Sequence, residues 1–209
     1  MDTKKTVTNE KRKAGGVTNV RYMTVTAMLS AVAFVLMFLE FSVPVMPEFI
    51  KMDLSELPAL IGTFALGPMC GVLICLIKNV LHLLVSTTGG VGELSNFLLG
   101  IAFVLPAGYI YKRKKNRNTA LIGSLLGAAF MAVFSVVSNY FLVYPFYYNI
   151  MPEETILAVY QFIAPSMKSI LQCLLCFNMP FTFVKGIFSV VITFLIYKHI
   201  SPILKGNHR

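Results

Sequence analysis

The segment from Asn118 to Pro152, NTALIGSLLGAAFMAVFSVVSNYFLVYPFYYNIMP, contains no charged residue. A helix needs about 20 predominantly apolar residues to cross the hydrocarbon core of a bilayer, and this run is longer than that. Its first part, about residues 119–142, predicts a membrane-spanning helix. The aromatic cluster at 144–148 is typical of the interface between membrane and water. This segment therefore predicts an integral membrane protein.

The composition of the whole chain agrees with that prediction. Of the 209 residues, 56% are apolar and only 13% are charged, whereas a soluble globular protein carries roughly 25% charged residues. This balance argues against a soluble enzyme, a disordered protein and a coiled coil. The net charge of +9 is concentrated in short segments between apolar runs, so we interpret it as a signal of membrane topology and not of nucleic-acid binding. The four cysteines lie in apolar surroundings and are expected to act as small hydrophobic residues.

Further apolar runs complete a predicted bundle. They cover about residues 22–39, 57–66, 68–85, 93–111 and 180–199. Gly67-Pro68 divides the second run from the third, because proline ends or kinks a helix at the preceding residue. Residues 153–177 are apolar at helical spacing but carry charge, and we interpret them as one or two helices near the membrane surface. The predicted fold class is an all-α integral membrane protein with six transmembrane helices.

The basic residues orient this bundle. Fourteen of the 18 Lys and Arg residues fall in the N-terminal 21 residues, in the loop 112–117 or at the C-terminal end, all on one side of a six-span topology. We expect the protein to lie in the plasma membrane, and the positive-inside rule places that side, with both termini, in the cytoplasm. The expected organisation is a flexible basic tail (1–20), a membrane domain (21–200) with outer loops near 42–57, 86–92 and 143–178, and a second tail (201–209).

A few polar residues lie at one depth near the outer end of the bundle: Asn139, Asn178, Thr182 and Lys185. A lysine inside a membrane helix is costly unless it snorkels, pairs or lines a wet cavity. Lys185 is therefore expected either to snorkel to the outer headgroups or to contribute to a substrate site, and the shared depth of the four residues favours a site. Interhelical hydrogen bonding is the alternative.

Lys78 and His82 form an i, i+4 pair on the third apolar run. We expect either a buried structural pair with a carboxylate such as Glu93 or Glu40, or a contribution to the cavity wall. One histidine without a convergent cluster of ligands does not predict a metal site. No Walker motif is present, so ATP hydrolysis would require other subunits.

Two outer loops carry further candidates. Residues 47–58 form a long loop of mixed polarity, which is typical of a lid, although Asp53 or Ser55 could instead cap the following helix. Residues 87–92 are rich in glycine, so their backbone can approach a ligand closely.

Taken together, these segments resemble a known family. They are KMDLSELPAL (51–60), FALGP (64–68), KNVLHLL (78–84), TGGVGEL (88–94), NYF (139–141) and PFTFVKG (180–186). Over about residues 24–198 the chain resembles the substrate-binding S components of energy-coupling factor (ECF) vitamin transporters, most closely the riboflavin-specific ones.

The resemblance implies a function for particular residues. Such S components have six membrane helices, bind one vitamin near the outer face and close the loop between the first two helices over it. They dock on a transmembrane coupling subunit and two ATPase subunits, and they are not enzymes. The implied riboflavin-binding residues are Asn139 and Lys185 for hydrogen bonds, and Lys51, Met52, Asp53, Leu54, Thr88, Gly89 and Gly90 for lid and loop contacts. Thr182 stands at a position where the family often has asparagine, and Asn178 or a water is expected to take over that hydrogen bond. Ala27 and Ala31 match the small-residue surface for the coupling subunit. No cofactor is implied besides riboflavin as the transported ligand.

Three alternatives remain at this point. The first is an S component for another vitamin or a precursor, which the departure at Thr182 keeps open. The second is a membrane-embedded enzyme. The sequence argues against it, because it has no paired-carboxylate or metalloprotease motif. The third is a stand-alone secondary transporter, which often has inverted repeats that this chain does not display.

Overall fold

The structure is a computed structural model that describes residues 3–43, 46–47, 50–86, 89–149 and 151–205, with side chains from Val20 to Ile196 within those ranges. The described chain is almost entirely helical. Its elements are α1 (Thr3–Phe38), β1 (Phe41–Ser42), β2 (Lys51–Met52), α2 (Glu56–Leu66), α3 (Pro68–His82), a 3-10 turn (Leu83–Val85), α4 (Val91–Arg113), α5 (Arg117–Ser138), a π-helical segment (Asn139–Val143), α6 (Tyr144–Tyr147), α7 (Glu153–Ile163), α8 (Ile170–Cys173), a second π-helical segment (Leu174–Asn178) and α9 (Met179–Lys205).

Within the described residues, five helical stretches are long and apolar enough to cross a membrane: Val20–Phe38, Pro68–Val85, Val91–Arg113, Arg117–Tyr147 and Ile170–Ile196. Each overlaps one of the apolar runs of the sequence. The remaining predicted span, residues 57–66, corresponds to α2, which has only 11 residues. At 1.5 Å per residue α2 is roughly 16 Å long, about half of a hydrocarbon core.

The predicted break between α2 and α3 is confirmed. Gly67 adopts a φ of 107° between the two helices, and Pro68 occupies the first turn of α3. A positive φ suits a residue without a Cβ, and a proline at the start of a helix has no N–H that the helix would use. The chain therefore reverses direction at this dipeptide.

The predicted start of the last span was wrong. The apolar helical stretch begins at Ile170 and not near Pro180, and it passes through the proline. The π-helical segment just before Pro180 explains how: the Met179 N–H donates to the Leu174 carbonyl, one residue further back than in an α-helix. This wider turn accommodates a residue that has no N–H to donate. Of residues 153–177, only α7 forms a separate helix.

The same device extends α5. The Tyr144 N–H donates to the Asn139 carbonyl across a π-helical turn, and Pro145 follows directly. The helical stretch consequently continues to Tyr147 instead of ending near residue 142.

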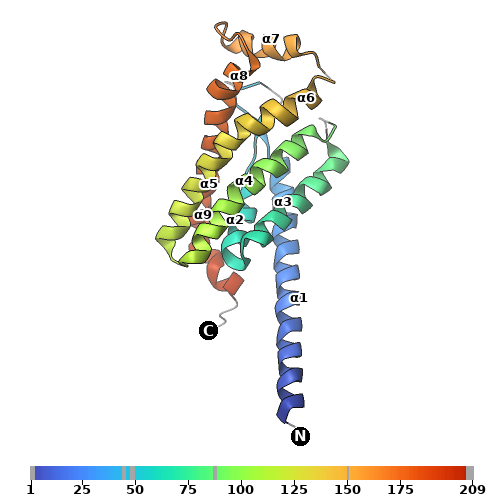
Figure 1. Ribbon diagram of the computed structural model, residues 1–209, viewed down its shortest axis with the longest axis vertical. Coiled ribbons are helices and arrows are strands. Elements are labelled where there is room, and N and C mark those ends of the chain that lie inside the picture. The colour runs from blue at the N-terminus through green and yellow to red at the C-terminus, as the bar shows by residue number, and fades with distance from the viewer. Residues whose placement is uncertain (1–2, 44–45, 48–49, 87–88, 150, 206–209) are drawn as a thin grey trace.

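The bundle is closed by tight helix contacts (Figure 1). The helix α5 packs along α4 and against α9, while α2 and α3 pack against each other and against α1. At Gly127 on α5 a Cβ would lie 2.5 Å from the Phe103 carbonyl oxygen of α4. No larger residue fits there without moving the two helices apart.

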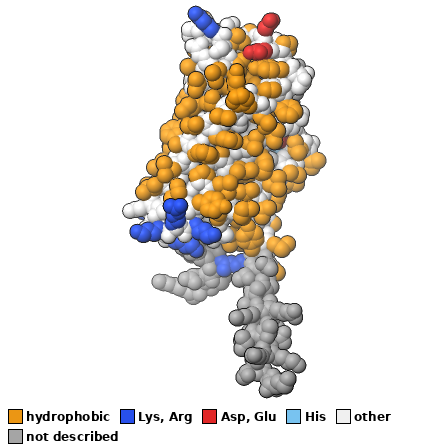
Figure 2. All heavy atoms as spheres, viewed as in Figure 1, with side chains coloured by type: hydrophobic (Ala, Val, Ile, Leu, Met, Phe, Trp, Pro, Cys, Tyr) orange, Lys and Arg blue, Asp and Glu red, His pale blue; other side chains and the backbone are white. Residues whose placement is uncertain are grey.

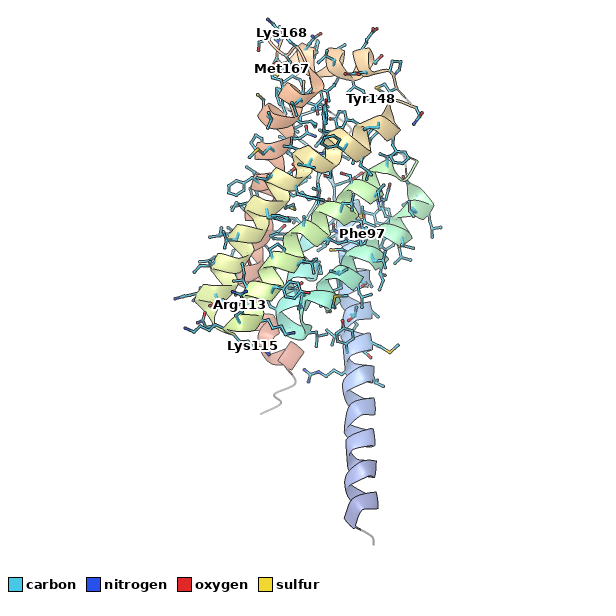
Figure 3. The ribbon with its side chains drawn as sticks, viewed as in Figure 1. Phe97, Arg113, Lys115, Tyr148, Met167 and Lys168 are labelled. Atoms are coloured by element: carbon cyan, nitrogen blue, oxygen red, sulfur yellow. The ribbon has the colours of Figure 1, made fainter. Side chains whose placement is uncertain are left out.

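Charged residues gather at the two ends of the molecule. On the face in Figure 2, hydrophobic side chains cover the middle of the bundle, and most of the visible Lys and Arg side chains gather at one end. Arg113 and Lys115, beside the turn between α4 and α5, lie at that end, whereas Tyr148, Met167 and Lys168 lie at the other (Figure 3). The start of α1 and the end of α9 also lie at the basic end, opposite α7 (Figure 1). Helix α1 begins at Thr3 and so runs through the segment predicted as a tail; its flexibility stays a prediction.

Candidate functional site

A cavity of about 870 Å³ lies between the loop after α1, the helices α4 and α9, and the cap formed by α6 and α7. Its size is within the range of small-molecule sites, roughly 300–1,000 Å³. Its walls combine apolar and aromatic side chains with a smaller set of polar ones. The lining includes Met37, Glu40, Ile50, Lys51, Asp53, His82, Glu93, Ser95, Asn96, Leu99, Asn139, Val143, Tyr144, Tyr147, Val159, Phe162, Asn178, Phe181, Thr182 and Lys185.

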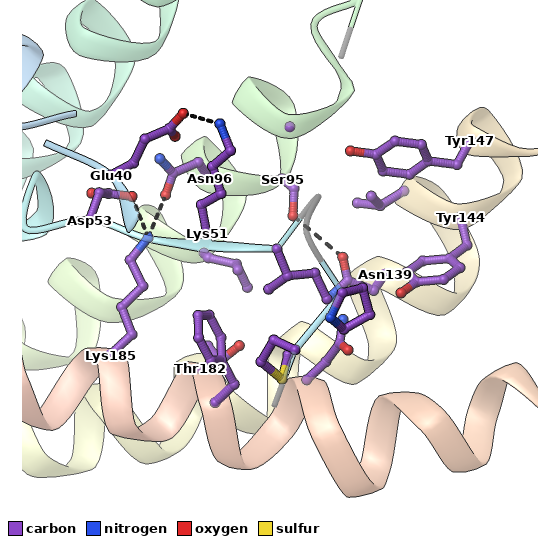
Figure 4. Close-up of a pocket in the computed structure, with 18 of the residues that line it drawn as sticks. Glu40, Lys51, Asp53, Ser95, Asn96, Asn139, Tyr144, Tyr147, Thr182 and Lys185 are labelled. Carbon is purple, nitrogen blue, oxygen red and sulfur yellow. Dashed lines mark hydrogen bonds and ion pairs between the residues drawn. The ribbon is translucent and has the colours of Figure 1, made fainter. Parts of the chain in front are cut away.

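Lys185 projects from α9 into this cavity and is held by two partners (Figure 4). Its Nζ lies 2.8 Å from Asp53 Oδ2 and donates to Asn96 Oδ1 at 3.3 Å. The lysine therefore does not snorkel to the headgroups. Burial alone would raise the pKa of Asp53, but the ammonium groups of Lys185 and Lys78 and the hydrogen bonds from Lys185 and Ser55 hold it well below its usual range. The aspartate is thus ionised and fixes Lys185 against the loop.

Two further pairs stand around the cavity. Lys51 on β2 forms an ion pair with Glu40 (Figure 4), and His82 Nδ1 lies 2.8 Å from Glu93 Oε1. Each basic side chain in the described lining thus faces a carboxylate. Such local compensation lowers the cost of keeping charged groups beside an apolar cavity.

The two π-helical segments each bring an asparagine to the cavity. Asn139 begins the first segment and Asn178 ends the second, and both side chains are buried. Asn139 Oδ1 accepts a long hydrogen bond of 3.4 Å from Ser95 Oγ (Figure 4). Single π-helical turns are frequent at functional sites because they re-aim the side chains around them.

The cap is joined to the cavity wall by a chain of hydrogen bonds. Tyr144 Oη and Tyr160 Oη are 2.6 Å apart, and the Tyr160 hydroxyl donates to Asn178 Oδ1 at 2.7 Å. Tyr160 lies on α7 and is fully buried. Burial and the neighbouring Tyr144 raise the pKa of Tyr160 above its usual value, so its hydroxyl keeps its proton.

Six of the predicted site residues line the cavity: Lys51, Asp53, Asn139, Asn178, Thr182 and Lys185. Met52 is buried and Leu54 half-buried beside them, but neither forms part of the lining. Gly89 and Gly90 both have positive φ, and Gly90 precedes α4 as its N-cap; they do not line the cavity either. Thr88 lies outside the described residues. Ala27 and Ala31 are exposed on α1, away from the cavity.

Several lining residues were missed by sequence reasoning. Glu40 was considered only as a partner of Lys78 or His82, but it pairs with Lys51. Asn96, which accepts from Lys185, was not named, and Tyr144 and Tyr147 were interpreted only as an interfacial belt. Asn96 carried a usable signal, because an amide within an apolar helix needs a partner in the membrane. The role of Tyr144 depends on its contact with α7, which no local pattern of the sequence reveals.

Lys78 belongs to a different environment. Its Nζ donates to Glu56 Oε1 at 2.8 Å and to Ser55 Oγ at 2.6 Å, and the side chain is completely buried between α2 and α3. The alternative of a buried structural pair is therefore confirmed, although Glu56 takes the place of the carboxylates that were named. His82, which pairs with Glu93, does line the cavity. The described residues contain no group of three potential metal ligands.

Comparison with known proteins finds a matching family and similar transporters. The family model described as "ECF transporter, substrate-specific component" matches residues 21–197. The chain is 34% identical over 197 residues to the riboflavin transporter RibU of Staphylococcus aureus (strain TCH60), covering 94% of this chain and 98% of that protein. It is 31% identical to the riboflavin transporter FmnP of Bacillus subtilis (strain 168), covering 88% and 93% of the two chains.

A solved structure is similar over the same length. The chain superposes on the one described as "Structure and mechanism of the S component of a bacterial ECF transporter" with a TM-score of 0.71 and 31% sequence identity. The superposition covers 90% of this chain and 99% of the other.

Proposed function

Because this chain belongs to the family of substrate-specific components of ECF transporters, we propose that it captures riboflavin at the outer face of the plasma membrane and serves as the substrate-binding subunit for its uptake. Two curated relatives that span nearly the whole chain are riboflavin transporters. The observation that carries the proposal is the cavity beneath α7, in which polar side chains from the loop after α1, from α3 and α4, and from the two π-helical stretches converge on an otherwise apolar volume.

The chemistry of riboflavin suits such a cavity. The vitamin has a large flat ring system with one polar edge, and a polyol chain. Leu99, Val143 and Phe181 offer apolar surface for the ring, while Asn139, Asn178 and Lys185 offer hydrogen-bonding groups in the same cavity. A few convergent polar groups on apolar walls are the usual design of a site for a ligand of this kind.

We infer six membrane segments with both termini in the cytoplasm. In this topology the loop after α1 enters the bundle from outside, and α2 supplies only the inner half of the second segment. A non-helical backbone is tolerated at membrane depth where protein covers it or where it lines a cavity. The loop residues Met52 and Asp53 are buried, which supports this arrangement. The orientation rests on the basic residues beside the α4–α5 turn.

Cysteine labelling tests the topology. With Cys176 replaced by serine, Lys115→Cys is expected to react with a membrane-impermeant maleimide only after cells are opened, whereas Glu154→Cys on α7 reacts in intact cells. The reverse pattern would overturn the orientation.

Transport itself is proposed to require partners. The exposed Ala27 and Ala31 on α1 form a small-residue surface against which another helix can pack closely. We propose that this surface contacts a transmembrane coupling subunit, which two ATPase subunits drive. Ala27→Leu and Ala31→Leu are expected to abolish uptake in cells without weakening riboflavin binding by the purified chain. Loss of binding in these variants would contradict the assignment of this surface.

The binding function is tested on the purified chain alone. We expect protein expressed without added vitamin and purified in detergent to show a flavin absorbance spectrum, and the stripped protein to quench riboflavin fluorescence with one-to-one stoichiometry. A colourless protein that fails to quench would overturn the riboflavin assignment. A screen of other vitamins would then follow, since family membership would be unaffected.

A further inference from the structure

The hydrogen-bond chain from α7 reaches the cavity without its first member touching it. Tyr160 is fully buried and is absent from the described lining, whereas its two partners Tyr144 and Asn178 both face the cavity. Its ring packs against that of Phe177, with centroids 5.6 Å apart. The phenol is thus held from behind the wall, in a fixed position relative to both partners.

The hydrogens in this chain have one consistent order. The Tyr160 hydroxyl has a single hydrogen, and it donates that hydrogen to Asn178 Oδ1. The 2.6 Å contact between the two phenol oxygens must then use the hydrogen of Tyr144, with Tyr160 as acceptor. Tyr144 therefore has no hydrogen left for the cavity, and its oxygen can only accept.

The same order fixes the amide of Asn178. Because Oδ1 is occupied by Tyr160, the NH2 group is the end of the amide that remains for the cavity. The Asn178 amide also interacts with the Tyr144 hydroxyl, and because its NH2 group carries two hydrogens, one of them remains for the cavity. The wall consequently presents a donor at Asn178 beside an acceptor at Tyr144, and both groups are neighbours because they bind the same phenol oxygen.

We propose that Tyr160 is a positioning residue that sets this polarity, so that the wall selects a ligand edge carrying an acceptor next to a donor. On the proposed function, on which this inference rests, the ring of riboflavin has only one such edge: its imide, where an N–H adjoins two carbonyl groups. The imide N–H would donate to Tyr144, and one carbonyl would accept from Asn178.

The orientation also explains why α7 matters to a site that it mainly covers. The cluster around Tyr160 includes Ile156 on the same helix and Ile170 and Leu174 on the last helical stretch. Docking of α7 through this apolar cluster brings the phenol to the asparagine. Selectivity thus depends on a segment whose charged first turn, with Glu153 and Glu154, is exposed.

The test compares riboflavin with its analogue methylated at the imide nitrogen, which lacks the donor. In the unaltered protein the analogue should bind more weakly.

The variant Tyr160→Phe leaves the Tyr144 hydrogen free to turn toward the cavity and the Asn178 amide free to flip. We expect riboflavin to bind about three- to tenfold more weakly to this variant, as befits one neutral hydrogen bond. The ratio of the two dissociation constants should shrink by a similar factor. The steric effect of the methyl group is common to both proteins and cancels in this comparison.

Controls separate positioning from general damage. Tyr109→Phe removes a hydroxyl from the exposed face of α4 and should leave both affinities unchanged. Tyr144→Phe should reduce the same ratio, and the double variant Tyr144→Phe/Tyr160→Phe should reduce it no further than one change alone, because both act on one chain of hydrogen bonds.

The outcomes are distinct. If Tyr160→Phe weakens both ligands equally, or neither, the residue does not set the polarity and the inference is overturned while riboflavin binding stands. If the unaltered protein does not bind riboflavin at all, the proposed function fails, and the assignment of the imide edge fails with it.

Discussion

Two lysines lie within apolar helices of this protein, and their surroundings differ. Lys78 is completely buried between α2 and α3, where it pairs with Glu56. Lys185 pairs with Asp53 in the cavity wall, and 11% of its side chain is exposed. The first pair is closed off from any ligand, whereas the second has access to the cavity. We infer that the same residue type supports the fold in one region and ligand binding in the other.

The two regions are also connected. The Ser55 hydroxyl accepts from Lys78 and donates to Asp53, which in turn binds Lys185. An unbroken polar chain thus runs from the interior of α2 and α3 through the loop to α9. This chain holds the loop against the cavity, and changes along it should divide between stability and affinity according to their position.

The largest effect is expected from Lys78→Met. Removing one partner of a buried ion pair leaves Glu56 charged and uncompensated, which typically costs about 3–5 kcal/mol of stability. We expect the variant to unfold at a much lower mole fraction of SDS in mixed micelles than the unaltered protein, or to yield little folded protein.

A paired change distinguishes charge from packing. Adding Glu56→Gln to Lys78→Met removes the orphaned charge, and most of the lost stability should return. If the single variant were as stable as the unaltered protein, the description of this region as a closed structural pair would be wrong.

Lys185→Met should have the opposite balance. A hydrogen bond from a charged group contributes about 1.5–3 kcal/mol, so riboflavin affinity should fall about 10- to 100-fold. Stability should fall less than in Lys78→Met, because Asp53 keeps its Ser55 partner and borders the cavity. Fluorescence titration gives the affinity, and the exposed Lys168→Met is a control with the same change of charge. An unchanged affinity would remove Lys185 from the site.

Asp53→Asn acts on the junction between the two regions, and a smaller effect is expected. Asparagine retains an acceptor for Ser55 but loses the charge opposite Lys185, so affinity should fall by about three- to tenfold. The lowered pKa of Asp53 means that its stabilising contribution is complete above the carboxyl pKa of the unfolded chain, about 3.9, and declines as the pH falls below it. Unfolding measured from pH 7 to pH 3 should therefore show a steeper loss on the acid side for the unaltered protein than for the variant.

The sequence was sufficient for most of the helical architecture. Apolar runs, the Gly67-Pro68 break and the basic loop are local signals, and the structure has helices and a turn at those places. The start of the last helix was wrong because a proline was interpreted as a helix boundary. The π-helical turn before Pro180 is stabilised by contacts within the bundle, and such contacts cannot be inferred from spacing along the chain.

The site was predictable in its members more than in its pairings. Depth in the membrane identified Asn139, Asn178 and Lys185 as a group, because polar residues in apolar helices are few. The partners of the lysines depend on which helix faces show toward each other, so Asp53 was expected in the lid but not as the counter-charge of Lys185. Tyr160 was missed entirely, since nothing local distinguishes it from other interfacial tyrosines.

The smallest effect is expected from Lys51→Met, at the outer edge of the cavity. Lys51 and Glu40 keep 38% and 30% of their side chains exposed, and an exposed ion pair typically contributes about 0–1 kcal/mol. Riboflavin affinity should therefore change less than about fivefold. The difference from the unaltered protein should shrink further in about 0.5 M salt, because salt at that concentration strongly screens exposed ion pairs. Titration at low and high salt measures both. A loss as large as that of Lys185→Met would mean that Lys51 binds the ligand directly, and that burial of the ion pair does not determine which lysine matters.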